Sequence, residues 1–243
     1  MKIYGLIGYP LSHSFSKKYF DEKFVQEKIS NAIFENFSIE NIRLLKEILS
    51  RKELKGFAVT IPYKKEVIAF LHESNEVVKQ INACNCVKIK DGKLYGYNTD
   101  VIGFEKSFVQ QLQPHHTKAL ILGTGGAAAA VEYVLQKLNI PYKFVSRTKQ
   151  VNNFTYNELN EVVMNEYSII INTSPLGTYP NVEECPAIPY QLLTAKHYLY
   201  DLVYNPTETK FLRLGKEKNC TVKNGYDMLV LQAEENWKIW NER

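Results

Sequence analysis

Three observations predict that this chain folds as an α/β protein of two domains. Apolar runs of strand length alternate with amphipathic helical segments through the first hundred residues, and the alternation resumes after a short linker at residues 113–116. One apolar run near residue 120 passes directly into a glycine turn and then a helical segment. Polar residues and glycines repeatedly follow the strand ends, which is where open parallel sheets bind ligands.

The first domain is expected to alternate strands with helices and to end in a hairpin. A helix is expected after the first turn, carrying the apolar residues Tyr19, Phe20, Phe24 and Val25. The Asp91-Gly92 pair predicts a tight hairpin turn, because both residues tolerate a positive φ. The expected strands are 3–8, 32–37, 56–62, 84–89 and 94–97, with helices ending near residue 25 and at 42–49 and 67–71.

The second domain repeats the alternation of strands and helices. Thr99 or Asp100 can cap the helix that leads into the linker. Gly225 precedes a long last helix. The expected strands are 119–122, 141–145, 167–172, 198–203 and 220–223, and the expected helices are 101–112, 126–138, 207–218 and 226–240.

The glycine turn Gly123-Thr124-Gly125-Gly126 predicts a dinucleotide site of the Rossmann type. Gly123 permits a sharp turn off the strand, Gly125 lets the backbone approach a phosphate, and the small Ala128 lets helix and strand pack closely. The following helix directs unpaired N–H groups and a partial positive charge at a bound anion. The alternative is a purely structural glycine turn, which the unambiguous strand and helix on either side disfavour.

The segment after the next strand indicates which dinucleotide binds. An NAD site usually carries an Asp or Glu there, which accepts hydrogen bonds from the ribose hydroxyls. This chain has Ser146-Arg147-Thr148-Lys149 instead, and a guanidinium suits a 2′-phosphate that a carboxylate would repel. The sequence therefore predicts NADP(H) rather than NAD(H). The alternative is that Arg147 is only a solvated surface arginine.

Composition and charge argue against several other classes of protein. Of the 243 residues 45% are hydrophobic and 23% charged, as in an ordinary globular protein. No apolar run reaches the roughly 18 residues of a membrane helix, and the N-terminus lacks a clear signal-peptide layout. We therefore expect a cytoplasmic protein without a membrane partner. The net charge of +4 is spread along the chain, which fits an anionic small molecule and provides no basic cluster for nucleic acid.

The cysteines and histidines give no indication of a metal site. Cys84 and Cys86 are separated by one residue, which is neither a redox motif nor a zinc-ligand spacing. His115 and His116 have no acidic or cysteine neighbours at ligand spacing. We expect reduced, mostly buried thiols and a pair of loop histidines.

Several polar residues after strand ends are candidates for ligand chemistry. Ser12 and Ser14 stand beside a helix start, where their hydroxyls could hold a carboxylate or only cap the helix. Lys64 could reach into a cleft, although a lysine at a helix start is more often solvated. Asp100 taken alone is more often a helix cap than a catalyst. Asn85 could present its amide to a hydroxylated ligand or bond within the hairpin.

Together these segments resemble the shikimate dehydrogenase family, and the resemblance covers essentially the whole chain. The order and spacing of the motifs make the match specific, which a glycine turn alone would not be. The matching motifs are GYPLSHSFS (8–16), VTIPYK (59–64), INACNCV (81–87), GYNTD (96–100), GTGGAAAA (123–130), NTSPLG (172–177), DLVYNPTET (201–209) and GYDMLVLQA (225–233).

The resemblance implies a fold and an activity. Residues 1–100, completed by 229–243, would form an α/β domain that binds substrate and carries the catalytic residues. Residues 101–228 would form a Rossmann-like NADP-binding domain. The family reduces 3-dehydroshikimate to shikimate with NADPH in aromatic amino-acid biosynthesis, and a monomer or homodimer is expected.

The resemblance also implies site residues. Lys64 and Asp100 would be the catalytic pair. Ser12 and Ser14 would bind the substrate carboxylate, and Thr60, Asn85, Asp100 and Gln232 its ring hydroxyls, with Tyr204 nearby. The cofactor would contact Gly123, Thr124, Gly125, Gly126, Ala127, Ser146, Arg147, Thr148, Lys149, Thr173, Ser174, Leu202, Gly225 and Met228.

Two other functions remain open at this point. One is a quinate/shikimate dehydrogenase that uses NAD, which the serine pair and Arg147 disfavour. The other is a non-catalytic module that senses a dinucleotide, which would need neither Lys64 nor Asp100.

The cofactor segment departs from the family pattern at one position. The family often has a basic residue where this chain has Val151, so Lys149 would be the only other cation beside Arg147.

Overall fold

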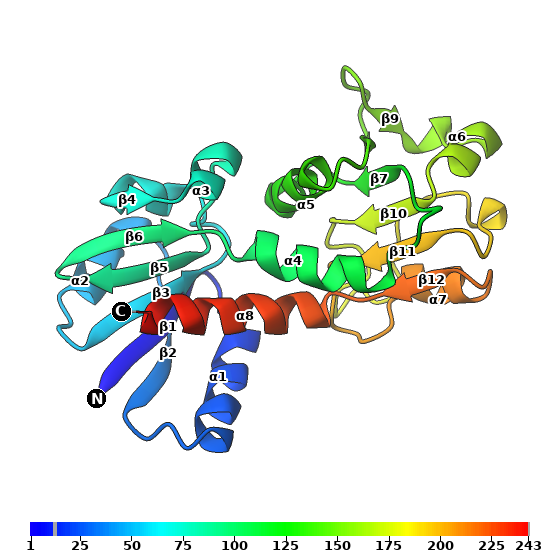
Figure 1. Cartoon of the computed structure of the whole chain (residues 1–243). Helices are drawn as coiled ribbons and strands as arrows, with labels where there is room; N and C mark the ends of the chain where they lie inside the picture. The colour runs from blue at the N-terminus through cyan, green and yellow to red at the C-terminus, as the bar shows by residue number, and fades with distance from the viewer. Residues whose placement is uncertain (12–13, 243) are drawn as a thin grey trace. The chain divides into compact units, whose positions relative to one another are not determined.

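The computed structural model describes residues 1–11 and 14–242, which form two compact units. The first unit comprises residues 1–100 and the chain from Gln232 onward, and the second comprises residues 101–231. The helices α4 (Asp100–Phe108) and α8 (Tyr226–Asn241) contain the points where the chain passes between units. Each unit has its own six-stranded sheet and hydrophobic core (Figure 1). The predicted α/β fold is confirmed.

The sheet of the first unit is mixed. Its elements are β1 (Lys2–Gly8), α1 (Phe15–Gln26), β2 (Ala32–Ser38), η1 (Ile42–Leu44), α2 (Leu45–Leu49), β3 (Leu54–Val59), η2 (Glu66–Phe70), β4 (Glu73–Ser74), α3 (Glu76–Ile81), β5 (Cys86–Lys90) and β6 (Lys93–Tyr97). The strand order is β2-β1-β3-β5-β6-β4. β1 and β3 are parallel, and β5 is antiparallel to both β3 and β6. The carboxyl ends of β1, β3 and β6 therefore lie at one edge of the sheet.

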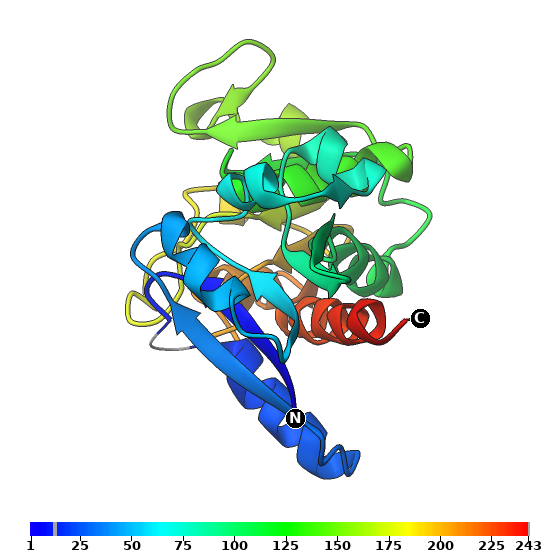
Figure 2. The same cartoon turned by 90° about the vertical axis from the view of Figure 1, so that its left-hand side faces the viewer.

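Helices cover both faces of this sheet (Figures 1 and 2). Ile3 and Ile7 belong to the core beneath α2, η2 and α3. Tyr4 and Leu6 belong to the core beneath α1 and α8. Because successive side chains of a strand point to opposite faces, the apolar run of β1 serves both cores at once.

Aromatic contacts hold the end of α8 against the first sheet. The Tyr4 ring stacks on Trp240 at 5.2 Å and meets Trp237 edge-on at 5.0 Å between centroids. The indole N–H of Trp240 donates to the Val87 carbonyl at 3.0 Å. Gly56 makes room for this indole, since a Cβ at position 56 would lie 2.3 Å from the ring. The part of the last helix that begins at Gln232 is thus an integral part of the first unit.

The sheet of the second unit is entirely parallel. Its elements after α4 are η3 (Val109–Gln111), β7 (Ala119–Leu122), α5 (Gly126–Lys137), β8 (Tyr142–Ser146), β9 (Phe154–Thr155), η4 (Tyr156–Glu158), α6 (Glu161–Glu166), β10 (Ile169–Asn172), η5 (Tyr190–Leu192), β11 (Tyr198–Asp201), α7 (Lys210–Lys216) and β12 (Thr221–Lys223). The order β12-β11-β10-β7-β8-β9 is that of the dinucleotide-binding fold, in which the strand order reverses between β7 and β10. The Rossmann-like prediction is confirmed.

The predicted elements differ from the observed ones mainly in the first unit. Strand β3 ends at Val59, three residues earlier than expected, and residues 60–65 form turns before η2. Short elements β4, α3, β9 and α6 were not expected, because segments of two to six residues carry little periodicity.

The helix expected to carry Val25 is present as α1, but Val25 does not lie on its buried face. Val25 is 79% exposed, whereas Lys23 is 7% exposed. The Lys23 ammonium lies 2.8 Å from Glu234 of α8 and 2.5 Å from Glu27. A lysine can replace an apolar residue here because a carboxylate distant in sequence neutralises its charge.

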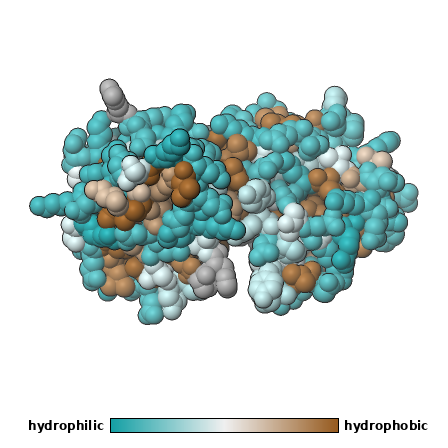
Figure 3. Space-filling model, turned by 90° about the horizontal axis from the view of Figure 1, so that it is seen from below, coloured by the Kyte–Doolittle hydropathy of each residue, from teal (hydrophilic) through white to brown (hydrophobic). Residues whose placement is uncertain are grey.

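Among the residues that the structure describes, none of the helices has the length and apolar character needed to cross a bilayer. The face shown in Figure 3 is mostly hydrophilic, with apolar side chains in local patches.

Candidate active site

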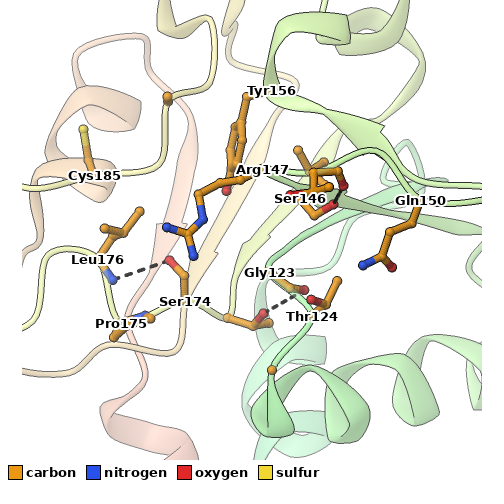
Figure 4. Close-up of a pocket in the computed structure, with 15 residues that line it drawn as sticks. Gly123, Thr124, Ser146, Arg147, Gln150, Tyr156, Ser174, Pro175, Leu176 and Cys185 are labelled. Carbon is orange, nitrogen blue, oxygen red and sulfur yellow. Dashed lines mark hydrogen bonds between the residues drawn. The ribbon is translucent and has the colours of Figure 1, made fainter.

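A pocket of about 570 Å³ lies at the carboxyl edge of the second sheet, at the ends of β7, β8 and β10 (Figure 4). This is the point where the strand order reverses, and such points are the usual ligand site of open parallel sheets. The residues that line it are Gly123, Thr124, Gly125, Val145, Ser146, Arg147, Thr148, Gln150, Tyr156, Thr173, Ser174, Pro175, Leu176, Cys185 and Ala187.

The glycine turn shapes one wall of this pocket. Gly123 has a φ of +105°, a conformation that a side chain would strain. Gly125 precedes α5 as its N-cap residue, and a Cβ added there or on Gly126 would meet nothing within 4 Å among the described residues beyond its own stretch of chain. Steric crowding by other parts of the protein therefore does not explain why these two positions are glycine. The open backbone at a helix N-terminus fits the phosphates of a dinucleotide.

Arg147 supplies positive charge on the opposite side. It follows β8 directly, between the pocket residues Ser146 and Thr148. In Figure 4 its side chain extends into the pocket beside Tyr156. Burial raises the pKa of Tyr156, and the Arg147 charge opposes that rise. A guanidinium in this place can pair with a phosphate that reaches the end of β8.

Lys149 lies differently from its neighbours. It does not line the pocket, and its ammonium bonds the Glu158 carboxylate at 2.6 Å. This lysine and two hydrogen bonds from Thr155 lower the pKa of Glu158 to about 2. Arg147 is thus the only cation among the described pocket residues.

Several other predicted cofactor residues lie outside the pocket wall, namely Gly126, Ala127, Leu202, Gly225 and Met228. For Gly225 the structure gives an internal reason for glycine. A Cβ there would lie 2.2 Å from the carbonyl oxygen of Leu202, so the start of α8 could not approach the end of β11. Met228 is buried one turn further along α8.

Lys64 and Asp100 form an ion pair in the first unit. The Lys64 ammonium lies 2.7 Å from Asp100 Oδ2, and the two side chains are 27% and 17% exposed. Lys64 follows β3 and Asp100 follows β6, and these strands end at the same edge of the sheet. The topology therefore brings together two residues that are 36 positions apart.

A network of buried amides and a hydroxyl extends from this edge. Asn85, 3% exposed, accepts the Thr99 backbone N–H at 2.6 Å and donates to the Thr99 hydroxyl at 3.0 Å. That hydroxyl donates to Asn236 Oδ1 at 2.7 Å, and Asn236 donates to Gln232 Oε1 at 3.2 Å. The network links two predicted substrate residues, Asn85 and Gln232, through two that the sequence did not single out for binding.

The remaining predicted substrate residues are placed as follows. Ser14 caps α1, accepting the Lys17 N–H at 3.3 Å. Thr60 directly follows β3, and its backbone N–H bonds the Ile7 carbonyl. Tyr204 lies after β11 in the second unit, where burial raises its pKa. Ser12 lies outside the described residues.

Sequence reasoning missed some of the site. Gln150, Tyr156 and Cys185 line the pocket from the segments that follow β8 and β10. Gln150 and Cys185 stand in irregular chain and Tyr156 begins the short helix η4, and no motif marks any of them. Asn236 lies on the buried face of an otherwise ordinary amphipathic helix. A polar residue at an apolar position of that pattern is the one signal that could have marked it.

The cysteines are free: Cys84, Cys86 and Cys220 are buried and Cys185 is half-buried. Burial raises the pKa of Cys84 to about 11. Within the described part of the chain, no group of three or more His, Cys, Asp or Glu side chains is arranged to hold a metal ion.

The parallel sheet, its glycine turn and the arginine after β8 define a dinucleotide-binding α/β protein. Comparison with known proteins identifies which one. The family model described as "Shikimate dehydrogenase substrate binding domain" matches residues 6–87. Shikimate dehydrogenase (NADP(+)) of Clostridium beijerinckii is 37% identical over 255 residues, which cover 100% of this chain and 93% of that protein. The chain belongs to the shikimate dehydrogenase family.

Solved structures agree with this assignment. A shikimate dehydrogenase crystallised in complex with NADP⁺ has a TM-score of 0.86 and 31% identity, over 99% of this chain and 90% of that one. A quinate dehydrogenase from Corynebacterium glutamicum in complex with NAD has a TM-score of 0.88 and 22% identity, over 99% and 93% of the two chains. At this lower identity the likeness shows only the shared fold.

Proposed function

We propose that the protein reduces 3-dehydroshikimate to shikimate with NADPH, in the shikimate pathway of aromatic amino-acid biosynthesis. The observation that carries this proposal is the Lys64–Asp100 ion pair at 2.7 Å, in a chain whose other unit holds a pocket with Arg147 as its cation. A redox enzyme that acts on a ketone needs a proton donor at the carbonyl oxygen and a bound hydride carrier. A module that only senses a dinucleotide has no use for the ion pair.

The residues of the pair have complementary roles in this proposal. NADPH supplies the hydride, and negative charge then grows on the ketone oxygen. The Lys64 ammonium stabilises that charge and delivers a proton to the oxygen. Asp100 accepts a hydrogen bond from Lys64 and orients the ammonium, and accepts a second hydrogen bond from a substrate hydroxyl.

The substrate carboxylate is assigned to the start of α1. The Ser14 oxygen accepts the Lys17 N–H, so its hydroxyl hydrogen remains available to a carboxylate, as proposed also for Ser12. Thr60, Asn85 and Gln232 would bind the ring hydroxyls, with Tyr204 nearby. The working enzyme would be a monomer or homodimer in the cytoplasm.

The cofactor is assigned to the second unit. Gly123, Thr124 and Gly125 would hold its phosphates, together with the start of α5 at Gly126 and Ala127. Arg147 would pair with the 2′-phosphate between Ser146 and Thr148, and Thr173 and Ser174 would form the facing wall. Leu202, Gly225 and Met228 are proposed to lie by the nicotinamide. Lys149 would contribute only if it left Glu158.

A spectrophotometric assay at the NADPH absorbance tests the proposal. Shikimate and quinate are each oxidised with NADP⁺ or NAD⁺, and 3-dehydroshikimate is reduced with NADPH or NADH. We expect the highest kcat/KM with shikimate and NADP⁺, and we expect Arg147→Ala to remove most of the preference for NADP⁺. Faster turnover of quinate with NAD⁺ would favour the catabolic alternative, and binding of a dinucleotide without turnover would favour a sensor.

A further inference from the structure

Three buried polar side chains lie beneath the Ser174 wall of the pocket and have no role in the function proposed above. Asn172 ends β10, Asp201 ends β11, and Thr209 caps α7. All three are 0% exposed. Buried polar groups at the carboxyl edge of a sheet require hydrogen-bond partners, and here the partners lead to the pocket.

The Asp201 carboxylate is held by three donors. The Thr209 hydroxyl donates to Oδ2 at 2.6 Å, and the Val203 N–H donates to Oδ1 at 3.0 Å. The Asn172 amide nitrogen donates to Oδ1 at 2.9 Å. An ionised carboxylate only accepts hydrogen bonds, so it compels Asn172 to present its NH₂ group.

The hydrogen bond to Asp201 therefore fixes the orientation of the Asn172 amide group. Its Oδ1 must face the other way, toward Ser174, where it accepts the backbone N–H at 3.0 Å and the hydroxyl at 2.6 Å. The reversed amide would place its NH₂ group against the Ser174 N–H, two donors in contact. It would also place its oxygen against the carboxylate, two acceptors in contact.

The orientation of Asn172 determines which way the Ser174 hydroxyl donates its hydrogen bond. A serine hydroxyl has a single hydrogen, and Asn172 accepts it. Oγ keeps its lone pairs, one of which meets the Leu176 N–H at the long distance of 3.4 Å (Figure 4). Ser174 lines the pocket with this oxygen as an acceptor, which suits a hydroxyl and does not suit a phosphate oxygen.

We propose that Asp201, acting through Asn172, fixes the Ser174 hydroxyl as the acceptor for a sugar hydroxyl of the bound dinucleotide. Asp201 and Asn172 are then positioning residues, and Ser174 is the residue that contacts the cofactor. This inference rests on the proposed use of NADP(H) by the pocket. It adds a contact that does not involve the 2′-phosphate.

The test is to titrate the protein with NADPH and NADH and follow the fluorescence of the bound nicotinamide. We expect Ser174→Ala to weaken both cofactors by a similar factor of about 5 to 10, the loss typical of one hydrogen bond. Asp201→Ala should weaken them comparably, because Asn172 then loses the acceptor that holds its NH₂ group. The double variant should bind no more weakly than Ser174→Ala alone.

Coupling in this double-mutant cycle separates positioning from a general structural effect. The proposal would be overturned by additive losses or by unchanged binding in Ser174→Ala. A loss confined to NADPH would also overturn it, because such a loss would indicate action through Arg147. If Asp201→Ala does not fold, Thr209→Val replaces it, and Thr209→Ser should restore binding. Glu166→Ala is the matched control, since Glu166 pairs with Lys118 on the exposed surface before β10.

The result is distinguishable from failure of the proposed function. If the unaltered protein binds neither cofactor, the assignment of the pocket itself is wrong. If it binds both but the cycle is additive, only the role of Asp201 is wrong.

Discussion

At the scale of single residues, Lys64 is the group on which the proposed chemistry depends most. Its side chain is 27% exposed and its ammonium lies against Asp100, whereas the next residue, Lys65, is exposed. Adjacent lysines therefore have different environments, although the sequence presents them as a pair. The difference arises because Lys64 follows the turn at the carboxyl edge of the sheet.

Replacing Lys64 by alanine should lower kcat by roughly 100-fold or more, with a smaller effect on KM for shikimate, because proton transfer at the substrate oxygen takes place in the transition state. Steady-state kinetics with NADP⁺ measure both constants. Lys65→Ala is the matched control and should keep near-normal kcat. A near-normal kcat in Lys64→Ala would remove the residue from the mechanism.

Asn236 offers a second test at this scale. It is 1% exposed and joins Thr99 to Gln232. Asn236→Leu keeps the size but leaves the Thr99 hydroxyl and the Gln232 oxygen without this partner. We expect KM for shikimate to rise several-fold, on the order of 1 kcal/mol in binding, with less change in kcat.

The control for Asn236 lies on the same helix. Asn241 is exposed, and its side chain contacts Tyr4 and the backbone of Trp237. Asn241→Leu should leave KM unchanged. If both variants raise KM equally, the effect comes from the helix as a whole and not from the network.

At the scale of elements, helix α8 completes the first unit by docking its aromatic end. Both tryptophans of the chain, Trp237 and Trp240, stand on this helix, so tryptophan fluorescence reports on its docking. Gly56 of β3 accepts the Trp240 ring, with no space for a Cβ. The fit between one glycine and one indole thus joins residues 184 positions apart, counting from 56 to 240.

Gly56→Ala should destabilise the first unit by about 1–3 kcal/mol, because a rigid ring must move to admit the methyl group. Urea unfolding followed by tryptophan fluorescence measures the loss, and the native spectrum should shift toward that of exposed indole. Gly92→Asn is a suitable control. Position 92 has open space and a φ of +72°, which asparagine tolerates. Equal stability of Gly56→Ala and the wild type would contradict the packing argument.

At the scale of the whole molecule, two buried groups give the stability opposite dependences on pH. Burial and the neighbouring His115 lower the pKa of His116 to about 4, and its Nε2 has no hydrogen-bond partner among the described residues. Burial raises the pKa of Asp201 to about 6 despite its three hydrogen bonds. The stabilising contribution of neutral His116 is lost as pH falls from about 6.5 through 4, whereas that of protonated Asp201 is lost as pH rises from about 4 through 6.

We therefore expect the difference in unfolding free energy between the wild type and His116→Gln to change with pH in the direction that the histidine alone dictates. Relative to the variant, the wild type should lose on the order of 1 kcal/mol per pH unit between pH 6 and pH 4. Urea unfolding of the second unit at several pH values measures this difference. The unfolding free energy of the wild type should itself vary less with pH than this difference, because the pH dependence from Asp201 runs opposite to that from His116. A difference that does not vary with pH would show that His116 binds a proton as readily in the folded state as in the unfolded state.

The order of strands and helices was predictable because it follows from local patterns. The glycine turn, the arginine after β8 and the hairpin at Asp91-Gly92 are short-range signals whose geometry depends on neighbouring residues alone. The short elements α3 and α6 and the early end of β3 were not predictable, because tertiary contacts decide such short segments. The resemblance to a family named the candidate residues, and their roles remain proposals.

What the sequence alone determined is the α/β class, the dinucleotide fold of the second half and the absence of an acidic residue after β8, since each depends on residues adjacent in the chain. Only the tertiary structure decided that Lys149 pairs with Glu158, that Lys23 replaces Val25 on the buried face of α1, and that Asp201 sets the polarity of Ser174. Each of these depends on a partner from a different segment. A hydrogen bond or ion pair is a property of two positions in space, and local periodicity carries no information about the second one.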